Sequence, residues 1–512
     1  MSMAKKTLLK SASVCSLLFA STASTAGVVE LKSSDGLMTV QGEILGIETG
    51  MLKVQTTYGQ ISIPANDVAC YGAACPVGVV RGGYEEEFSV GFDDEGRRDL
   101  LVALLNAKDV AARSATTIEV FDGQSARVTN PEAFQTASLQ FLSPGDEDGE
   151  MRVATESVNF DVQFTFSSAS EWSDPSSVVS HHLAVQGLGV LLGPDTGVTQ
   201  LSAEDLARIY SGEARNWSEF GGNDLAIQTL RAADGTAAHE NLKAAVMTPF
   251  GHDTFGDGLL FRTEEQAAQV TSVARGAVAV VSLGAVGDAN LIRVVNSCGA
   301  GIEPSNFAIN TGDYPLTVAT YAAVTSTSET QVLARVFDAA VDSSVLTDAG
   351  YADESILLGD RARTQQRIAD LSGLGASHQA TADVQDLMDS LQESEQLSMS
   401  FQDGPVSAAT GAKSRADFVR LSEAILNGNF DGSEIHFVGF AKGADEEEAV
   451  ENASTSAASI LKAFTRFSPE AAEYPNVTFR TSGHGTAGKA FCAANQPAMV
   501  TNEVEIWVRT AS

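Results

Sequence analysis

Between residues 80 and 345, short apolar runs alternate with stretches that suit helices. Residues 183–192 (LAVQGLGVLL) and 276–284 (GAVAVVSLG) are almost wholly apolar, whereas residues 240–247 (ENLKAAVM) have helical composition. Apolar runs of this length, bounded by turn residues, indicate strands that are buried on both faces. Their alternation with helices predicts an α/β layer architecture for this part of the chain.

The segments on either side follow different patterns. Residues 27–79 alternate apolar and polar side chains in short runs, which predicts a small antiparallel β-module. Residues 346–398 are polar and helix-prone, as expected of a linker with one amphipathic helix. Residues 399–512 combine helical and strand patterns in a compact α+β unit. We therefore expect three folded parts and one linker.

The first 26 residues have the order of a secretory signal. Lys5 and Lys6 precede an apolar stretch through Phe19, and small residues crowd the end at Ser24 and Ala26. This order predicts a signal peptide over residues 1–26 and an exported protein. After it, no run reaches the roughly 18 apolar residues that a membrane span needs, so we expect a soluble mature chain without a transmembrane segment.

The net charge limits which partners the chain can bind, and the cysteines bear on whether its compartment is oxidising. The formal net charge is −34, which repels nucleic-acid phosphates and anionic lipid, so we expect no nucleic-acid partner. Cys70 and Cys75 are close enough to form a local disulfide in an oxidising compartment. A second bridge between Cys298 and Cys492 and the alternative of four reduced thiols both stay open.

The most informative segment is residues 201–222 (LSAEDLARIYSGEARNWSEFGG). Ser202 is a good N-cap for a helix whose apolar residues Leu206, Ile209 and Tyr210 would face inward. Gly212 is suited to end that helix. None of these side chains indicates catalysis, so the segment predicts a packed helix.

The same segment resembles the signature of phosphate-type periplasmic substrate-binding proteins of ABC transporters. Residues 183–194, 274–284 and 312–316 resemble further motifs of that family, in the family's order. Together the four matches cover roughly residues 155–340. The resemblance implies an α/β fold of two lobes joined by crossover strands, with a small, phosphate-like anion held in the cleft between them.

In that family an Arg and a Ser-Gly-Thr turn hold the anion at a helix N-terminus, where free N–H groups favour negative charge. The matching residues here are Arg231, Asp234, Gly235 and Thr236. Asp234 stands in place of the serine and brings like-charge repulsion and an acceptor where a donor is needed. An ion pair between Arg231 and Asp234 is the alternative to ligand contact.

The first lobe departs from the family in a similar way. Residues 88–96, where the family has a Gly-Ser-rich turn, are acidic at Asp93 and Asp94. The resemblance assigns later first-lobe contacts to Asp161, Ser167 and Ser168, and Gln186 stands where the family has Asp. These changes indicate a degenerate or re-purposed cleft.

Residues from Phe401 onward resemble OmpA-like domains, with residues 435–440 as the strand before the binding loop. In that family an Asp and an Arg bind the peptidoglycan peptide through charge-assisted hydrogen bonds. The Asp position falls on Lys442 and the Arg position on or near Ser459. The resemblance implies an envelope-associated domain whose partners would be peptidoglycan or outer-membrane-associated proteins, although both anchoring charges are absent.

No motif indicates an enzyme, a cofactor or a metal site. Residues 483–490 fit the start of a phosphate-binding loop, but Ala490 offers no hydroxyl for magnesium, and the histidines lack metal-ligand spacing. We therefore expect a solute-binding protein in the periplasm of a Gram-negative bacterium. The alternative is an envelope scaffold that kept both folds and lost both ligand sites.

Overall fold

The computed structural model describes residues 28–33, 38–71, 75–76, 79–81, 84–92, 94–130, 135–142, 162–165, 178–296, 299–325, 331–339, 343–359, 387, 391–402, 411–485 and 503–510. These residues form two compact units, one ending at Tyr84 and the other beginning at Glu85. The predicted signal peptide lies outside the described residues.

The first unit is a six-stranded sheet with the order β4-β3-β2-β1-β5-β6. Its strands are β1 (Val28–Ser33), β2 (Thr39–Glu48), β3 (Met51–Thr56), β4 (Gly59–Pro64), β5 (Val68–Tyr71) and β6 (Val80–Arg81). Neighbours are antiparallel except β5 and β6, which are parallel. Thr49 and Gly50 have φ angles of 50° and 77° between β2 and β3, as a two-residue hairpin turn requires.

The predicted disulfide between Cys70 and Cys75 is confirmed, with a Cα–Cα distance of 5.8 Å. Both cysteines are buried in the apolar core of the sheet, together with Leu31 and Val54. The bridge therefore adds a covalent link to a core of modest size. Cys298 and Cys492 lie outside the described residues, so their pairing stays a prediction.

The second unit is mixed α/β and contains a ten-stranded sheet with the order β15-β14-β16-β12-β19-β11-β7-β10-β9-β8. The strands of its first lobe are β7 (Tyr84–Phe92), β8 (Thr117–Phe121), β9 (Ser125–Asn130), β10 (Gln135–Phe141) and β11 (Val162–Thr165). Those of its second lobe are β14 (Gln228–Ala232), β15 (Leu259–Phe261) and β16 (Ala277–Ser282). Two strands, β12 (Val178–Leu192) and β19 (Thr317–Thr325), lie between the two sets.

Helices and short strands complete both lobes. Those of the first lobe are α1 (Glu95–Asn106), α2 (Lys108–Arg113), α7 (Gln331–Phe337) and α8 (Ser343–Asp348). Those of the second lobe are α3 (Ala203–Tyr210), η2 (Trp217–Phe220), α4 (Ala237–Leu242), η3 (Lys243–Met247), η4 (Thr248–Phe250), α5 (Glu264–Val273), η5 (Leu283–Ala285) and α6 (Asn306–Thr311). A three-stranded sheet of β13 (Gln200–Ser202), β17 (Arg293–Val295) and β18 (Gly301–Ile302) also belongs to the second lobe.

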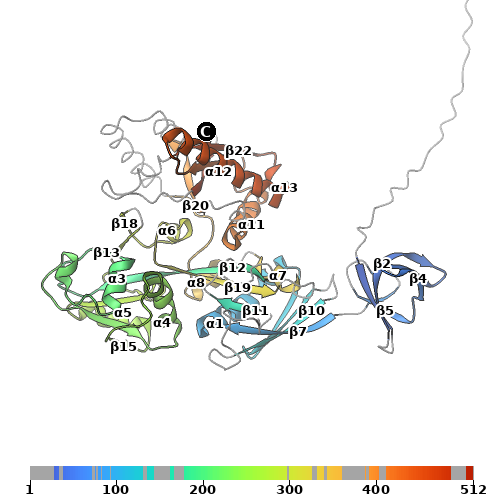
Figure 1. Cartoon of the computed structure of the whole chain (residues 1–512), viewed down its shortest axis with the longest axis horizontal. Coiled ribbons are helices and arrows are strands. Elements are labelled where there is room, and N and C mark those ends of the chain that lie inside the picture. The colour runs from blue at the N-terminus through green and yellow to red at the C-terminus, as the bar shows by residue number, and fades with distance from the viewer. Residues whose placement is uncertain are drawn as a thin grey trace, which may run out of the picture. The chain divides into compact units, whose positions relative to one another are not determined.

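Strand β12 connects the two lobes, as Figure 1 shows. Its first part pairs with β19, and its last five residues pair with β16. Accordingly, Leu183 and Ala184 are buried in the core of the first lobe, while Leu188 and Val190 are buried in that of the second. One continuous strand therefore contributes to two separate cores.

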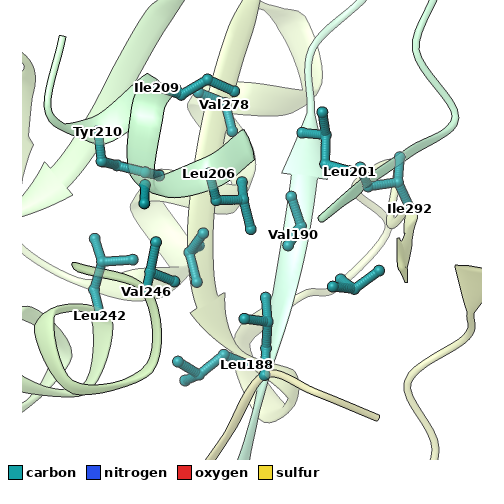
Figure 2. Close-up of a cluster of buried hydrophobic side chains, with 14 of the residues drawn as sticks. Leu188, Val190, Leu201, Leu206, Ile209, Tyr210, Leu242, Val246, Val278 and Ile292 are labelled. Atoms are coloured by element: carbon teal, nitrogen blue, oxygen red, sulfur yellow. The ribbon is translucent and has the colours of Figure 1, made fainter. Parts of the chain in front are cut away.

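Helix α3 forms as the sequence predicts. The Ser202 side chain accepts from the N–H of Asp205, whose carboxylate accepts from the N–H of Ser202, so the two form a capping box. Figure 2 shows Leu206, Ile209 and Tyr210 in the core beside Val190 of β12. The buried side of α3 therefore packs in the same core as the crossover strand β12.

The C-terminal part of the second unit is a four-stranded sheet with the order β20-β23-β21-β22. Its strands are β20 (Glu395–Gln402), β21 (Ser433–Phe440), β22 (Val477–Gly483) and β23 (Glu503–Thr510), and its helices are α11 (Ala412–Leu426), α12 (Glu446–Phe467) and α13 (Pro469–Ala472). Phe418 of α11 and Phe464 of α12 are buried in one core with Phe437 of β21. The two long helices therefore share the apolar face of the sheet.

Two paired glycines bring α12 close to this sheet. Gly439 of β21 lies opposite Gly483 of β22. A Cβ at Gly439 would lie 2.1 Å from the Ala453 carbonyl oxygen, and one at Gly483 would lie 2.1 Å from the Ser454 backbone nitrogen. Both distances are shorter than any real contact, so α12 can approach only because these positions have no side chain.

Helix α11 docks on the first lobe through a buried charge network. The Arg420 guanidinium contacts the carboxylates of both Glu354 and Asp417. Glu354 is 6% exposed and its Oε1 lies 3.1 Å from Nε2 of His182 in β12. Although burial alone would raise it, the pKa of Glu354 is well below its usual range because His182 and Arg420 stabilise the ionised form.

Further contacts of α11 reach β12, α6 and α2. Arg415 donates to the carbonyl oxygen of Ser180 in β12, and Lys413 donates to that of Asn310 at 3.2 Å. Arg113 forms a more exposed pair with Glu423 at 2.9 Å. Helix α11 therefore contacts β12 at two points: at the backbone of Ser180 directly, and at the side chain of His182 through Glu354.

None of the described helices is long and apolar enough to cross a membrane.

The four-stranded sheet also contains the buried imidazole of His436, from which we predict that the free energy of unfolding falls in acid. Burial, with the charges of Arg480, His484 and Arg509, lowers the pKa of His436 to about 4. The fold thus holds the ring neutral, and its contribution to stability is complete above pH 6.5 and lost progressively down to about pH 4. We expect a loss of about 3 kcal/mol over this range.

Urea unfolding of the wild type and of His436→Gln between pH 7 and pH 4 measures this effect. The variant lacks the titrating ring, so its unfolding free energy should fall less steeply with pH. Parallel curves for the two proteins would contradict the assignment to His436.

Candidate functional site

A cavity of about 630 Å³ lies between the two lobes. The first lobe lines it with residues of α1 and α8, and the second lobe does so with residues of α4 and α5. Gln186 reaches it from β12. Clefts of this size between lobes are where small ligands usually bind, so it is the candidate site.

A second cavity of about 410 Å³ lies between α11 and the first lobe. Its lining includes the ion-paired residues His182, Glu354 and Arg420. Because these side chains pair with one another and join α11 to β12, we assign this cavity to the docking interface of α11.

An internal ion pair occupies the first-lobe side of the candidate site. Asp94 is the N-cap of α1 and accepts from the backbone N–H of Arg97 at 3.0 Å. Its second carboxylate oxygen contacts the Arg97 guanidinium. The two residues are only 1% and 2% exposed. The chain's own carboxylate therefore occupies the helix start where an anion would otherwise dock.

The two lobes meet beside this ion pair. A Cβ placed at Gly96, in the first turn of α1, would lie 3.1 Å from the Cβ of Ala237, the first residue of α4. This distance is tighter than an ordinary van der Waals contact, so the starts of the two helices meet directly at one side of the cavity, where Gly96 leaves room for Ala237. Such proximity indicates lobes in a closed arrangement.

Two amides connect β12 to the second-lobe wall. Gln186 donates through Nε2 to the carbonyl oxygen of Gly350 at 3.3 Å, and its Oε1 accepts from Nδ2 of Asn241. Asn241 is 6% exposed, and its Oδ1 receives no hydrogen bond from the described residues. The wall thus contains one buried acceptor without a donor.

A carboxylate and a phenol also line the cavity. Glu264, at the start of α5, accepts from the N–H of Ser282 at 2.8 Å and from its hydroxyl at 2.5 Å. Burial raises the pKa of Glu264 despite these hydrogen bonds. Burial also raises the pKa of Tyr351, so this phenol keeps its proton and can donate.

The residues expected to hold an anion in the second lobe are close together. Arg231 is the penultimate residue of β14 and donates to the Asp234 carboxylate at 2.7 Å, and this hydrogen bond lowers the pKa of Asp234. The Arg231 guanidinium also lies 5.7 Å from the centre of the Phe255 ring. The alternative of an ion pair is therefore what the structure contains, while a ligand role for Arg231 stays a prediction.

The rest of the predicted turn lies directly before the cavity wall. Gly235 has a φ of +79°, which an L side chain rarely adopts. Thr236 is the N-cap of α4, and its hydroxyl donates to the carbonyl oxygen of Ala233 at 2.7 Å. The predicted first-lobe contacts Asp161, Ser167 and Ser168 lie outside the described residues, so they stay predictions.

Sequence reasoning missed three of the cavity's polar residues. Asn241 and Glu264 were not singled out because their partners, Gln186 and Ser282, are distant in the sequence. Arg97 could have been found, because an Asp N-cap followed three residues later by Arg is a local pattern.

Comparison with known proteins shows which family part of the chain is similar to. Residues 161–339 match a family described as a PBP superfamily domain. The chain is 24% identical over 229 residues to the phosphate-binding protein PstS of Bacillus subtilis, covering 43% of this chain and 72% of that protein. It is 23% identical over 106 residues to PstS of Borreliella burgdorferi, covering 20% and 38%.

Two solved structures are similar at lower sequence identity. The structure of PstS from Borrelia burgdorferi has a TM-score of 0.40 and 13% identity, covering 52% of this chain and 98% of its own. An ABC-type phosphate transport receptor from Vibrio cholerae has a TM-score of 0.39 and 16% identity, covering 52% and 99%. From the family match and the sequence relatives, residues 161–339 form a PBP-like domain with phosphate-binding proteins among its relatives.

Proposed function

We infer that this chain is an exported, non-enzymatic solute-binding protein of the phosphate-type family. It takes a small polar or anionic solute into the cavity between its lobes and works in the periplasm of a Gram-negative bacterium. The C-terminal part is an OmpA-like domain that associates with the envelope. The observation that carries the proposal is the 630 Å³ cavity, which both lobes and a crossover strand line.

The relatives and the topology support this proposal. The sequence relatives are named as phosphate-binding proteins. Strand β12 passes from one lobe core to the other, so bending of this strand and of β19 would open and close the cavity. The predicted signal peptide and the Cys70–Cys75 disulfide are both compatible with export.

A thermal-shift screen of the mature chain tests the proposal. The panel comprises inorganic phosphate, sulfate, amino acids, sugars and amines. A true ligand at 100 times its Kd should stabilise the folded state by about 2.7 kcal/mol. The shift should disappear in Ala238→Trp, which fills the cavity, and persist in Ala444→Trp, on an exposed loop. If no solute shifts the wild type, the solute-binding proposal is wrong.

The second candidate function is an envelope scaffold. Its support is that the chain's own carboxylates contact the groups expected to hold an anion: Asp234 pairs with Arg231, and Asp94 caps the start of α1. A scaffold should co-sediment with purified peptidoglycan and show no solute shift. Binding that is unchanged in Lys442→Ala would indicate a contact different from that of the OmpA-like family, and absence of binding would remove peptidoglycan as its partner.

A further inference from the structure

The orientation of the amides in the cavity follows from one backbone carbonyl. The carbonyl oxygen of Gly350 can only accept, so Gln186 must present its NH₂ group there. The Gln186 oxygen then faces Asn241, which must present its own NH₂ group in return. The remaining atom of the Asn241 amide is therefore its oxygen, an acceptor.

This acceptor needs a donor from a ligand. Asn241 lines the cavity, is 6% exposed and receives no hydrogen bond at Oδ1 from the described residues. Leaving a buried acceptor without a donor costs about 1 to 3 kcal/mol. A hydrogenphosphate dianion could donate only its single hydroxyl here, and its two negative charges would lie among the carboxylates that line the cavity.

The carboxylates that line the cavity also favour a ligand that donates hydrogen bonds, and they favour a positive charge on it. Among the described residues, the lining holds one guanidinium, that of Arg97, which the Asp94 carboxylate contacts directly. Beyond this pair the lining contains three further carboxylates, those of Asp99, Glu264 and Asp348, which come from three different helices. Asp99 lies 3.7 Å from Arg98, while Glu264 is partly buried and accepts only from Ser282 in the described residues.

We propose that the cavity between the lobes binds a small aliphatic amine in its cationic form, and that an oxyanion is excluded from it. An ammonium group donates three hydrogen bonds and accepts none. It would donate to the Asn241 oxygen, and the carboxylates of Glu264 and Asp348 would attract its charge. This inference rests on the proposed function, because it assigns a chemical class to the same site.

Isothermal titration of the mature chain with putrescine, inorganic phosphate and glucose tests the inference. Putrescine should give a saturable heat, and phosphate should give none. Glu264→Gln and Asn241→Leu should each weaken putrescine binding by at least about tenfold, which corresponds to 1.4 kcal/mol. Glu265→Gln removes an equal charge from the next, exposed position of α5 and should change the affinity by less than about twofold.

The outcomes separate the inference from the proposed function. Putrescine binding that is equal in the wild type, Glu264→Gln and Asn241→Leu would place the amine elsewhere and overturn the inference. Phosphate or glucose binding that Ala238→Trp abolishes, without putrescine binding, would overturn the inference and leave the proposed function intact. Absence of all three heats overturns the inference, and the solute screen then decides the proposed function. Circular dichroism checks that each variant is folded, and Glu264→Gln decides if Asn241→Leu is not.

Discussion

Arg420→Met will lower the free energy of unfolding by about 3 kcal/mol, the lower end of the loss expected on breaking a buried ion pair. The substitution removes the cation that two buried carboxylates share, while Asp417 keeps Lys413 at 2.8 Å and Glu354 keeps His182. Glu354 and Asp417 are 6% and 1% exposed, and Arg420 contacts both. Methionine preserves much of the side-chain volume, so the effect will report the lost charge. Urea unfolding monitored by tryptophan fluorescence or circular dichroism measures it.

The neighbouring pair of Arg113 and Glu423 provides a matched control. Its side chains are 41% and 39% exposed, and exposed ion pairs contribute about 0 to 1 kcal/mol. Arg113→Met should therefore have a small effect at the same interface. Adding Glu354→Gln to Arg420→Met should restore part of the lost stability, since it removes one of the two buried carboxylates that lost the Arg420 guanidinium. Equal losses in Arg113→Met and Arg420→Met would show that the buried network has no special role.

Gly439→Val will destabilise the C-terminal part by about 3 kcal/mol, as expected for overpacking a well-filled interface. Even the first carbon of the new side chain would lie 2.1 Å from the Ala453 carbonyl oxygen. Relief requires α12 to move away from β21 and from the apolar core around Phe464. Denaturant unfolding gives the loss.

Gly284→Ala is the corresponding control, because a Cβ at Gly284 meets no atom within 4 Å and its φ is not in the left-handed region. Its effect should stay within about 0.5 kcal/mol. Unfolding free energies that agree between Gly439→Val and the wild type would show that α12 can shift at no cost.

Local patterns in the sequence predict several elements well. The capping residues and apolar spacing around Ser202 predict α3, and the apolar run at residues 183–192 predicts the buried part of β12. These elements depend on neighbours within a few residues. By contrast, the start of α12 at Glu446 has little local apolar signal, because its first turns carry the exposed side chains of Glu447, Glu448 and Glu451.

The candidate site is less accessible from sequence for a physical reason. Gln186 and Asn241 are 55 residues apart, and Gln186 and Gly350 are 164 apart. No periodicity links such pairs, because they meet only once the sheet has assembled. The family resemblance located the turn at Arg231 and Asp234, but the acceptor at Asn241 emerges only from the three-dimensional arrangement.

The position of β19 has a consequence for the order of assembly. The first lobe needs β19 between β11 and β12, yet residues 317–325 follow the whole second lobe in the chain. The second lobe is nearly contiguous and can nucleate from local contacts, whereas the first must wait for a long loop to close. As the chain emerges from its N-terminus during synthesis, strands β11 and β12 would therefore remain incompletely paired until β19 arrives, and this interval is when the chain most needs a chaperone.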